Sequence, residues 1–450
     1  MTANSPSETA SISVESAPAR KTPFPRYALG LLVLIYVLNT LDRQIVNILA
    51  EPIKHDLGLR DWQIGVLTGL SFALFYATLG IPIARLAERG NRPLIIATAV
   101  TFWSMFTALC GLSQNFIQLV MARVGVGVGE AGCTPAAHSL ISDLVPREKR
   151  ASALGLYAMG APLGGLLGMA LGGLLADLWG WRSAFLIAAA PGLIVGVITA
   201  LTLKEPRNAL KAAAQKAADL SPTLKEAVRE LRACRSFWLF GFGSALQGLI
   251  AYGHSAFLGS FFFRNPGPEL AQIAGGLGMQ TAGFLGVAIG LLAGVSGMLG
   301  AFMGGKLADR HTATNPRGLA TQVAVFNLLA VPVYILAMLV PSAPLALGLL
   351  FLPSLFYGMT YGPLFAVFQS VVQPRTRATA VAIYLLMANL VGLGVGPLLV
   401  GAASDYFAEG LKMGSGEGLR WAQILSTLLG FGAFWLYWRA RRYIASDTVG

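Results

Sequence analysis

Runs of about 20 predominantly apolar residues recur along the whole chain, and this recurrence restricts the fold more than any other feature. A helix of that length crosses a hydrocarbon layer about 30 Å thick. Only 12% of the 450 residues are charged, whereas soluble proteins carry about 25%. The outer surface must therefore be apolar as well, which predicts an all-α protein that spans a membrane many times.

Twelve apolar runs can be placed, joined mostly by short polar connections. They cover residues 27–50, 63–85, 93–113, 115–139, 150–176, 181–203, 236–263, 281–306, 317–340, 344–371, 377–404 and 419–440. The longest connection, 204–235, holds eight Lys or Arg residues and divides the runs into two sets of six. The predicted fold is a polytopic membrane protein with twelve transmembrane helices in two six-helix bundles.

The Lys and Arg residues are distributed unequally between the two predicted sides of the membrane. With the N-terminus in the cytoplasm, 25 of the 33 lie in the inward-facing segments, six lie in outward loops, and two lie inside apolar runs. Cytoplasmic loops carry such an excess, so both termini are predicted to be cytoplasmic, in a bacterial inner membrane. The net charge of +12 is spread over short loops without a contiguous patch, which argues against nucleic acid as a partner.

Two sequence patterns occur once in each half of the chain. Residues 84–89 (Ala-Arg-Leu-Ala-Glu-Arg) and 305–310 (Gly-Lys-Leu-Ala-Asp-Arg) both follow the second run of their half. Residues 160–165 (Gly-Ala-Pro-Leu-Gly-Gly) and 394–397 (Gly-Val-Gly-Pro) both lie in the fifth run. Two patterns repeated in register indicate a duplicated transporter architecture.

This duplication predicts five segments. Residues 1–26 form a disordered cytoplasmic tail, 27–203 the N-terminal six-helix bundle, 204–235 a cytoplasmic linker, 236–440 the C-terminal six-helix bundle and 441–450 a second cytoplasmic tail. The linker is either a tether or a helix that lies on the inner membrane face, because apolar residues recur at helical spacing near its end.

Three of these motifs resemble signatures of the major facilitator superfamily, and the resemblance covers nearly all of the chain. The loop signature is similar to residues 84–92 and 305–310. The fourth-helix signature is similar to 123–129 (Arg-Val-Gly-Val-Gly-Val-Gly), and the fifth-helix signature, which the superfamily's antiporters tend to carry, is similar to 160–165. The resemblance implies the major facilitator fold, with two pseudo-symmetric bundles that give access to opposite membrane faces in turn.

A narrower resemblance is to the Spinster family of lipid transporters. It rests on residues 41–43 (Leu-Asp-Arg), 88–92 (Glu-Arg-Gly-Asn-Arg) and 129–131 (Gly-Glu-Ala). Asn91 stands where the wider superfamily usually has Gly, and Pro93 where it often has Arg. The resemblance implies proton-linked movement of amphiphilic lipids, such as lysophospholipids or molecules like sphingosine phosphate.

Four ionisable residues lie inside the predicted spans, namely Asp42, Arg43, Arg123 and Glu130. An ionised group at the centre of a membrane helix costs about 2.5–3.5 kcal/mol even on mild scales, so each needs a partner or water. We predict that Asp42 and Glu130 take up protons, while Arg43 and Arg123 tune them and bind an anionic substrate head. A static ion-pair network between the first and fourth helices is the alternative. The sequence leaves open which Arg pairs with which acid.

Three further groups of residues are candidates for supporting roles. The predicted cytoplasmic gate comprises Glu88, Arg89, Asp309 and Arg310. The predicted helix-bend motif comprises Gly160, Pro162, Gly164, Gly165 and Pro397. Candidate residues for the cavity lining are His254, Phe356, Tyr357, Tyr361 and Phe365, for which lipid contact or packing is the alternative role.

The preferred hypothesis is a proton-coupled secondary transporter of amphiphilic lipids that works by alternating access as a monomer. Its predicted partners are the substrate and the bilayer, and the proton gradient is its only energy source, without a cofactor or metal. A drug or small-metabolite/proton antiporter is the alternative within the superfamily. Other classes are a membrane receptor or channel and a lipid-modifying enzyme. No Gly-Lys-Ser or Gly-Lys-Thr phosphate loop occurs, and the three cysteines lack metal-ligand spacing.

Overall fold

The computed structural model describes residues 24–146, 149–206, 224–312, 316–373 and 376–448. Side chains of a few helical residues, including Glu88 and Arg89, lie outside this description. Those ranges contain helices and no strand, as predicted. Residues 1–23 of the predicted tail 1–26 and residues 207–223 of the predicted linker 204–235 fall outside them, whereas residues 24–26, predicted as tail, are helical.

The N-terminal half forms six rods, several of which are built from consecutive helical pieces. They are α1 (Phe24–Ile48); α3 (Asp61–Gly65), η1 (Val66–Leu70) and α4 (Ser71–Arg89); α5 (Arg92–Leu112); α6 (Phe116–Glu130) and α7 (Cys133–Leu144); and α8 (Arg150–Ala158) followed by α9 (Gly160–Thr202). The short α2 (Ala50–Leu57) connects the first two rods. Because Gly180 in α9 has φ +81°, a conformation that favours glycine, the chain turns there and α9 supplies both the fifth and the sixth rod.

The C-terminal half repeats this arrangement. Its rods are α12 (Arg235–Arg264); α14 (Thr281–Thr312); α15 (Pro316–Leu339); α16 (Ala343–Ser370); α17 (Arg377–Met387), η4 (Ala388–Val395), α18 (Gly396–Asp405) and η5 (Tyr406–Gly410); and α19 (Ser415–Ala440). The short helices are α11 (Leu224–Ala233), α13 (Gly267–Gly276) and α20 (Ile444–Asp447).

Nine helical stretches in the described ranges are long and apolar enough to cross a membrane. One of them, Ser152–Thr202, has 51 residues and is bent at Gly180, so it accounts for two rods. The rods α12 and α19, of 30 and 26 residues, complete a set consistent with the twelve predicted spans. The protein is therefore an all-α membrane protein.

Several predicted boundaries differ from the observed ones. The fourth span, predicted as 115–139, continues to Leu144 and is interrupted at residues 131–132, between α6 and α7. The linker segment that precedes α12 forms α11, whose Leu231 is buried against the C-terminal bundle. The Leu231 carbonyl oxygen accepts a hydrogen bond from Trp238 Nε1 at 2.9 Å. This end of the linker is therefore attached to protein.

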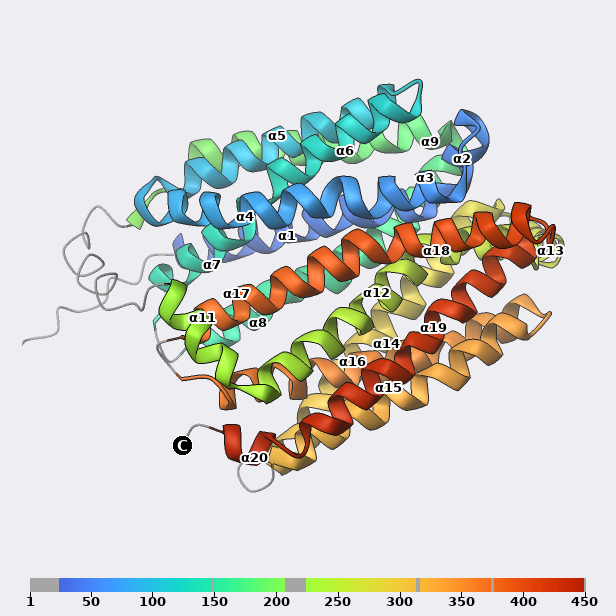
Figure 1. Ribbon diagram of the computed structural model, residues 1–450. Coiled ribbons are helices and arrows are strands. Elements are labelled where there is room, and N and C mark those ends of the chain that lie inside the picture. Colours follow the sequence, from blue (N-terminus) through green and yellow to red (C-terminus); the bar gives the residue numbers. More distant parts are fainter. Residues whose placement is uncertain (1–23, 147–148, 207–223, 313–315, 374–375, 449–450) are drawn as a thin grey trace, which may run out of the picture.

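The helices of each half lie together, and the two bundles stand side by side with their rods roughly along one direction (Figure 1). The start of α1, the helix α11 and the C-terminal α20 lie at one end, here called the terminal side. The short helices α2, α3 and α13 lie at the opposite end, here called the distal side. Contacts between the bundles are therefore described by side.

Small residues allow α1 and α9 to approach closely. A Cβ atom added to Gly160, Gly164 or Gly168 would come closer than 3.0 Å to atoms of α1. These glycines recur every four residues, so they lie on one face of α9. Three of the predicted helix-bend residues, Gly160, Gly164 and Pro162, thus lie where α9 starts after a break at Met159. Such small-residue contacts are the usual means of packing membrane helices.

We predict that Gly164→Ala destabilises the protein, because its Cβ would collide with the Val37 carbonyl oxygen of α1. Overpacking of this kind costs about 1–3 kcal/mol. The matched control is Gly165→Ala, whose Cβ would meet no atom closer than 3.9 Å. Thermal unfolding of the purified variants in detergent should show a lower melting temperature for Gly164→Ala alone, and equal melting temperatures would contradict the assigned packing.

Candidate functional site

One buried ion pair joins two helices of the N-terminal bundle inside the membrane-spanning region. Arg43 Nε of α1 donates to Glu130 Oε2 at the end of α6, at 2.6 Å. The Glu130 side chain is fully buried, whereas the Arg43 side chain keeps 23% of its surface exposed. The pairing that the sequence left open is therefore Arg43 with Glu130.

The Arg43 guanidinium also contacts two aromatic rings of α4. Its Cζ lies 4.7 Å from the ring centre of Phe72 and 4.5 Å from that of Tyr76. Such cation–π contacts partly replace water around the charge. In the part of the chain that the structure describes, Arg43 Nη2 and Glu130 Oε1 have no hydrogen-bond partner. The pair thus retains unused hydrogen-bonding capacity on both members.

The second acid and the second arginine lie nearby but are held differently. The Thr107 hydroxyl of α5 donates to Asp42 Oδ2 at 2.5 Å, and Asp42 is 4% exposed. Arg123 of α6 is 1% exposed, and its Nε points at the Leu67 carbonyl oxygen at 3.5 Å. Arg123 acts on Asp42 electrostatically, without an ion-pair contact between them among the described residues. Its burial separates it from any space that a substrate could enter in this conformation.

Two candidate lining residues, Tyr361 and Phe365 of α16, expose 59% and 38% of their surface. Tyr361 nevertheless lies in electrostatic range of Tyr36 in α1 and Tyr252 in α12. A residue between these two helices faces the space between the bundles and not lipid. Tyr252 is also in range of Arg43. Tyr361 and Phe365 thus present exposed aromatic surface, and Tyr361 lies near the half-buried Tyr36 and Tyr252 between the bundles.

The remaining lining candidates are less exposed. Phe356 stacks on Phe326 of α15 with ring centres 5.9 Å apart, and Tyr357 is half-buried. His254 is 5% exposed and stacks on Tyr334 of α15 at 3.8 Å. Its Nε2 lies within hydrogen-bond distance of the Ser426 hydroxyl of α19, at 3.1 Å. His254 thus contacts the interior of its own bundle, which favours a packing role.

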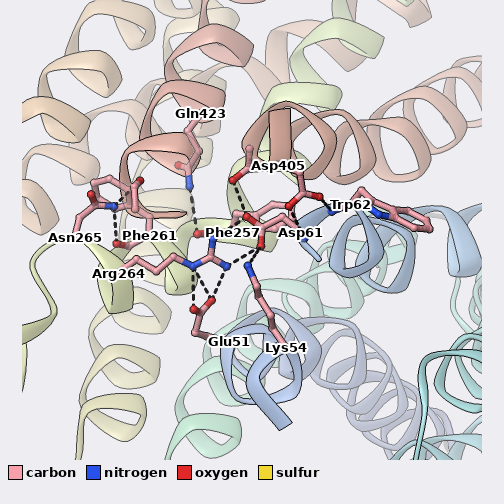
Figure 2. Close-up of polar contacts among 12 residues, drawn as sticks. Glu51, Lys54, Asp61, Trp62, Phe257, Phe261, Arg264, Asn265, Asp405 and Gln423 are labelled. Carbon is pink, nitrogen blue, oxygen red and sulfur yellow. Dashed lines mark hydrogen bonds and ion pairs between the residues drawn. The ribbon is translucent and has the colours of Figure 1, made fainter. Parts of the chain in front are cut away.

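On the distal side, four charged residues form a buried group that joins the two bundles (Figure 2). This distal ion cluster consists of Glu51, Lys54, Asp61 and Arg264. Arg264, at the end of α12, donates to Glu51 Oε2 of α2 at 2.7 Å and to Asp61 Oδ2 of α3 at 2.7 Å. Lys54 Nζ lies 2.6 Å from Asp61 Oδ1. A bidentate guanidinium thus connects two N-terminal helices to the C-terminal bundle.

The distal ion cluster was missed in the sequence because its members were counted as outward-loop charges. Their side chains are instead 7% or less exposed, except that of Lys54 at 19%. The α2 helix directly follows α1 and ends at Leu57, where Gly58 with φ +63° forms the C-cap. Its residues Glu51 and Lys54 contact Arg264 and Asp61, respectively. The signal available in the sequence was an unusual density of opposite charges beside two span ends.

A polar group lies between the distal ion cluster and the Arg43–Glu130 pair. Asn47 Nδ2 of α1 donates to Gln44 Oε1 at 2.9 Å and to the Ser255 hydroxyl of α12 at 3.2 Å. The bundles are thus in contact below the cluster as well. Further contacts between α9 and α14 on this side close the distal side.

The terminal side lacks such contacts at the positions that can be compared. A Cβ added to Gly155 of α8, or to Gly297 and Gly305 of α14, would meet no atom within 4 Å. The predicted gate residues Asp309 and Arg310 are exposed, while the side chains of Glu88 and Arg89 lie outside the described residues. Among the described residues, the hydrogen bonds and ion pairs between the bundles lie on or near the distal side, which they hold closed.

A second charged group, not predicted as a site, holds the terminal side of the N-terminal bundle together. Arg92 at the start of α5 is fully buried and forms ion pairs with Asp143 of α7, at 2.6 Å, and with Glu205 after α9. Its Nη1 also donates to the Ser139 carbonyl oxygen at 3.0 Å. All of these partners belong to one bundle, so the group rigidifies that bundle without joining it to the other.

We predict that Arg264→Ala opens the distal side. Removing one partner of a buried ion pair costs about 3–5 kcal/mol, because Asp61 then keeps Lys54 as its only ion-pair partner and Glu51 keeps only the His55 ring. A cysteine introduced at Ser255 should react faster with an impermeant thiol reagent applied from the distal side.

The control is Arg60→Ala, which removes an exposed pair between the bundles, Arg60 with Glu409 at 3.2 Å. An exposed pair contributes about 0–1 kcal/mol, so labelling should barely change. Equal labelling of the two variants would show that the distal ion cluster does not hold the bundles together.

Comparison with known proteins agrees with this architecture. Residues 32–397 match the Major Facilitator Superfamily. The chain is 34% identical over 411 residues to an MFS-type efflux pump of Mycolicibacterium smegmatis, covering 91% of each chain. It is 25% identical over 389 residues to Protein spinster homolog 1 of Xenopus tropicalis, covering 84% of this chain and 73% of that protein.

A solved structure is also similar over almost the full length. It is the crystal structure of a bacterial homologue of the human lysosomal transporter Spinster in an inward-facing, occupied conformation. The TM-score is 0.83 at 32% identity, and the match covers 95% of this chain and 99% of that one. The buried charges, the twelve-rod arrangement and these similarities lead to one conclusion: the chain belongs to the major facilitator superfamily and is a Spinster-like membrane transporter.

Proposed function

We propose that the protein is a proton-coupled secondary transporter of amphiphilic lipids with an anionic head and a single apolar chain. The observation that carries this proposal is the Arg43–Glu130 ion pair, which is buried on its acidic side and partly exposed on its basic side. An arginine in that position can exchange its carboxylate partner for an anionic ligand. The exposed aromatic surface of Tyr361 and Phe365 offers contact for an apolar chain.

Proton coupling follows from competition for Arg43. When Glu130 takes up a proton, its attraction for the guanidinium falls, and Arg43 becomes free to pair with an anionic head group. Ligand and proton then favour the same state, which shifts the population between two conformations. Asp42, with Arg123 and Thr107 beside it, is the second acid in this scheme. The proton gradient is the only energy source required, and a monomer suffices.

Alternating access gives the two sides their roles. With both termini in the cytoplasm of a bacterium, the terminal side is cytoplasmic and the distal side periplasmic, so the conformation described is inward-facing. Residues 27–203 would rock against residues 236–440 about the substrate. In the opposite conformation, Glu88 and Arg89 would approach Asp309 and Arg310 and brace the closed cytoplasmic end. Asp309 and Arg310 are exposed here, which agrees with the open state.

A drug or small-metabolite antiporter is the second candidate. The 34% identity to an efflux pump favours it, because that relative covers the chain as fully as the Spinster-like structure does. The two candidates differ in the ligand that Arg43 must bind. An anionic lipid needs the free guanidinium, whereas a cationic or neutral drug would gain nothing from it.

We predict that Glu130→Gln abolishes proton-driven transport. The variant cannot exchange a proton at this site, so uptake into proteoliposomes should fall by about tenfold or more, equivalent to about 1.4 kcal/mol or more. Asp42→Asn should likewise remove or displace the pH dependence. Glu409→Gln, on an exposed side chain, serves as the control. If Glu130→Gln and Asp42→Asn fold normally and transport with unchanged pH dependence, the network is structural and proton coupling lies elsewhere.

We also predict a characteristic pH dependence of ligand binding. Affinity of the normal protein for an anionic lysophospholipid should rise as pH falls, because protonated Glu130 releases Arg43. In Glu130→Gln the affinity should be high and independent of pH, and in Arg43→Ala it should be lost. Arg182→Ala, on a side chain 40% exposed, is the control. Thermal-shift titrations measure the affinities, and mass spectrometry identifies copurified lipids. A ligand affinity that is unchanged in Arg43→Ala would favour the drug-antiporter candidate.

A further inference from the structure

We infer that Asp177 and Asp405 are a matched pair of helix-capping residues that hold the distal side closed, each from the fifth rod of one bundle to the second rod of the other. This inference rests on the alternating access proposed above. It assigns the closure to two side chains that lie outside the intramembrane charges and outside the distal ion cluster.

Asp405 is the last residue of α18 in the C-terminal bundle, and it caps α3 in the N-terminal bundle. Its Oδ1 accepts from the backbone N–H of Asp61 at 3.0 Å, and its Oδ2 accepts from that of Trp62 at 2.8 Å. Both interactions are visible in Figure 2. The first N–H groups of a helix have no partner within their own helix. The cap that α3 needs is thus supplied by the opposite bundle.

Asp177 makes the corresponding contact in the reverse direction. It lies in α9 of the N-terminal bundle, and its Oδ2 accepts from the backbone N–H of Gly283 at 2.5 Å. Gly283 is in the first turn of α14, the second rod of the C-terminal bundle. A carboxylate at this place also interacts favourably with the positive end of the helix dipole. Each bundle therefore gives one cap and receives one.

The two contacts share the same spacing along the sequence. Four residues before each aspartate lies a glycine, Gly173 before Asp177 and Gly401 before Asp405. A Cβ at Gly173 would come closer than 3.0 Å to the Ala282 carbonyl oxygen, and a Cβ at Gly401 to the Asp61 carbonyl oxygen. The glycine brings the two helix backbones together, and the aspartate one turn later reaches the unpaired N–H groups.

The correspondence continues one turn deeper into the membrane. Gly286 lies against the Met169 carbonyl oxygen, and Gly65 lies against the Pro397 carbonyl oxygen. In the first contact, Met169 precedes Gly173 by four residues, and Gly286 follows Ala282 by four. In the second contact, Pro397 precedes Gly401 by four residues, and Gly65 follows Asp61 by four. The opposite directions are those expected for antiparallel helices. The agreement over two turns makes the pair a feature of the duplicated architecture and not two unrelated surface contacts.

These caps suit a contact that must break and reform. Both aspartates are half-buried, so when the bundles separate on the distal side, water can reach the carboxylate and the freed N–H groups. The distal ion cluster differs, because its members other than Lys54 are nearly fully buried and it occurs at only one of the two contacts. At the other contact, Ala282 occupies the place of Asp61. The aspartate caps therefore occur at both contacts between a fifth rod and a second rod, whereas the ion cluster occurs at one.

The test measures distances between spin labels at Ile117 of α6 and Leu411 beyond α18, which are 72% and 53% exposed on the distal side of opposite bundles. The three native cysteines are first replaced by alanine. Asp177→Ala and Asp405→Ala should each raise the ratio of distal-open to distal-closed molecules about fivefold, as expected for the loss of a helix cap. The double variant should raise it on the order of 25-fold, since the two sites are separate.

Three further variants separate capping from general damage. Asp177→Asn should restore most of the closed population, because the one amide oxygen can accept the Gly283 N–H bond that Asp177 Oδ2 accepts. Asp405→Asn should restore less, because Asp405 accepts two N–H bonds with two oxygens and an amide has only one. Asp56→Ala is the matched control, since Asp56 pairs with Arg182 of its own bundle on the distal side at 2.5 Å. It should leave the distances unchanged. Melting temperatures confirm that each variant is folded.

Three results would overturn the inference. If Arg264→Ala opens the distal side while Asp177→Ala, Asp405→Ala and the double variant do not, alternating access stands and the caps are passive. If a single distance persists in every variant, at every pH and with ligand, the proposed rocking fails and the inference fails with it. An opening in Asp56→Ala equal to that in the capping variants would also overturn it, because the effect would then not depend on contact between bundles.

Discussion

A charge or an unpaired backbone N–H inside an apolar layer is stable only where another polar group or water reaches it, and the polar contacts of this protein follow from that constraint. Glu130 is fully buried and takes Arg43 as its partner, and Arg43 in turn lies against the rings of Phe72 and Tyr76. Arg43 Nη2 and Glu130 Oε1 keep no hydrogen-bond partner among the described residues. In the proposed transport scheme, this unused hydrogen-bonding capacity would serve an anionic ligand and a proton.

The same constraint explains why the two sides of the molecule are built differently. The distal side uses Arg264 between Glu51 and Asp61, together with aspartates that cap helices of the opposite bundle. All of these contacts cross between the bundles. On the terminal side, Arg92 binds Asp143 and Glu205 within one bundle, so it strengthens that bundle without joining it to the other. The polar contacts therefore divide into those within one bundle and those that set the position of one bundle relative to the other.

Sequence reasoning could predict the membrane class, the duplicated halves and the four intramembrane charges, because each depends on local composition or on a repeated motif. It could not choose between Arg43 and Arg123 as the partner of Glu130, since the choice depends on the rotation of α1 and α6 by less than a turn. The distal ion cluster was missed for a different reason. Arg264 and Glu51 are 213 residues apart, and their burial arises only when the bundles meet. His254 looked like a lining residue by its aromatic neighbours, but it stacks on Tyr334 inside its own bundle.

The spacing of glycine and aspartate in the fifth rod of each half is visible in the sequence, but its role becomes evident only when the two halves are compared in the structure. Gly173 with Asp177, and Gly401 with Asp405, have the same spacing in corresponding rods, yet each alone is an ordinary helix end. Their role depends on the helix of the opposite bundle that faces them, where Gly65 and Gly286 allow the two helix backbones to approach closely. Under the alternating access proposed above, equivalent contacts in both halves would hold the two pairs of rods with similar strength. The ion cluster breaks that equivalence at α3 alone, which places the additional charge on the same N-terminal bundle that carries Arg43 and Glu130.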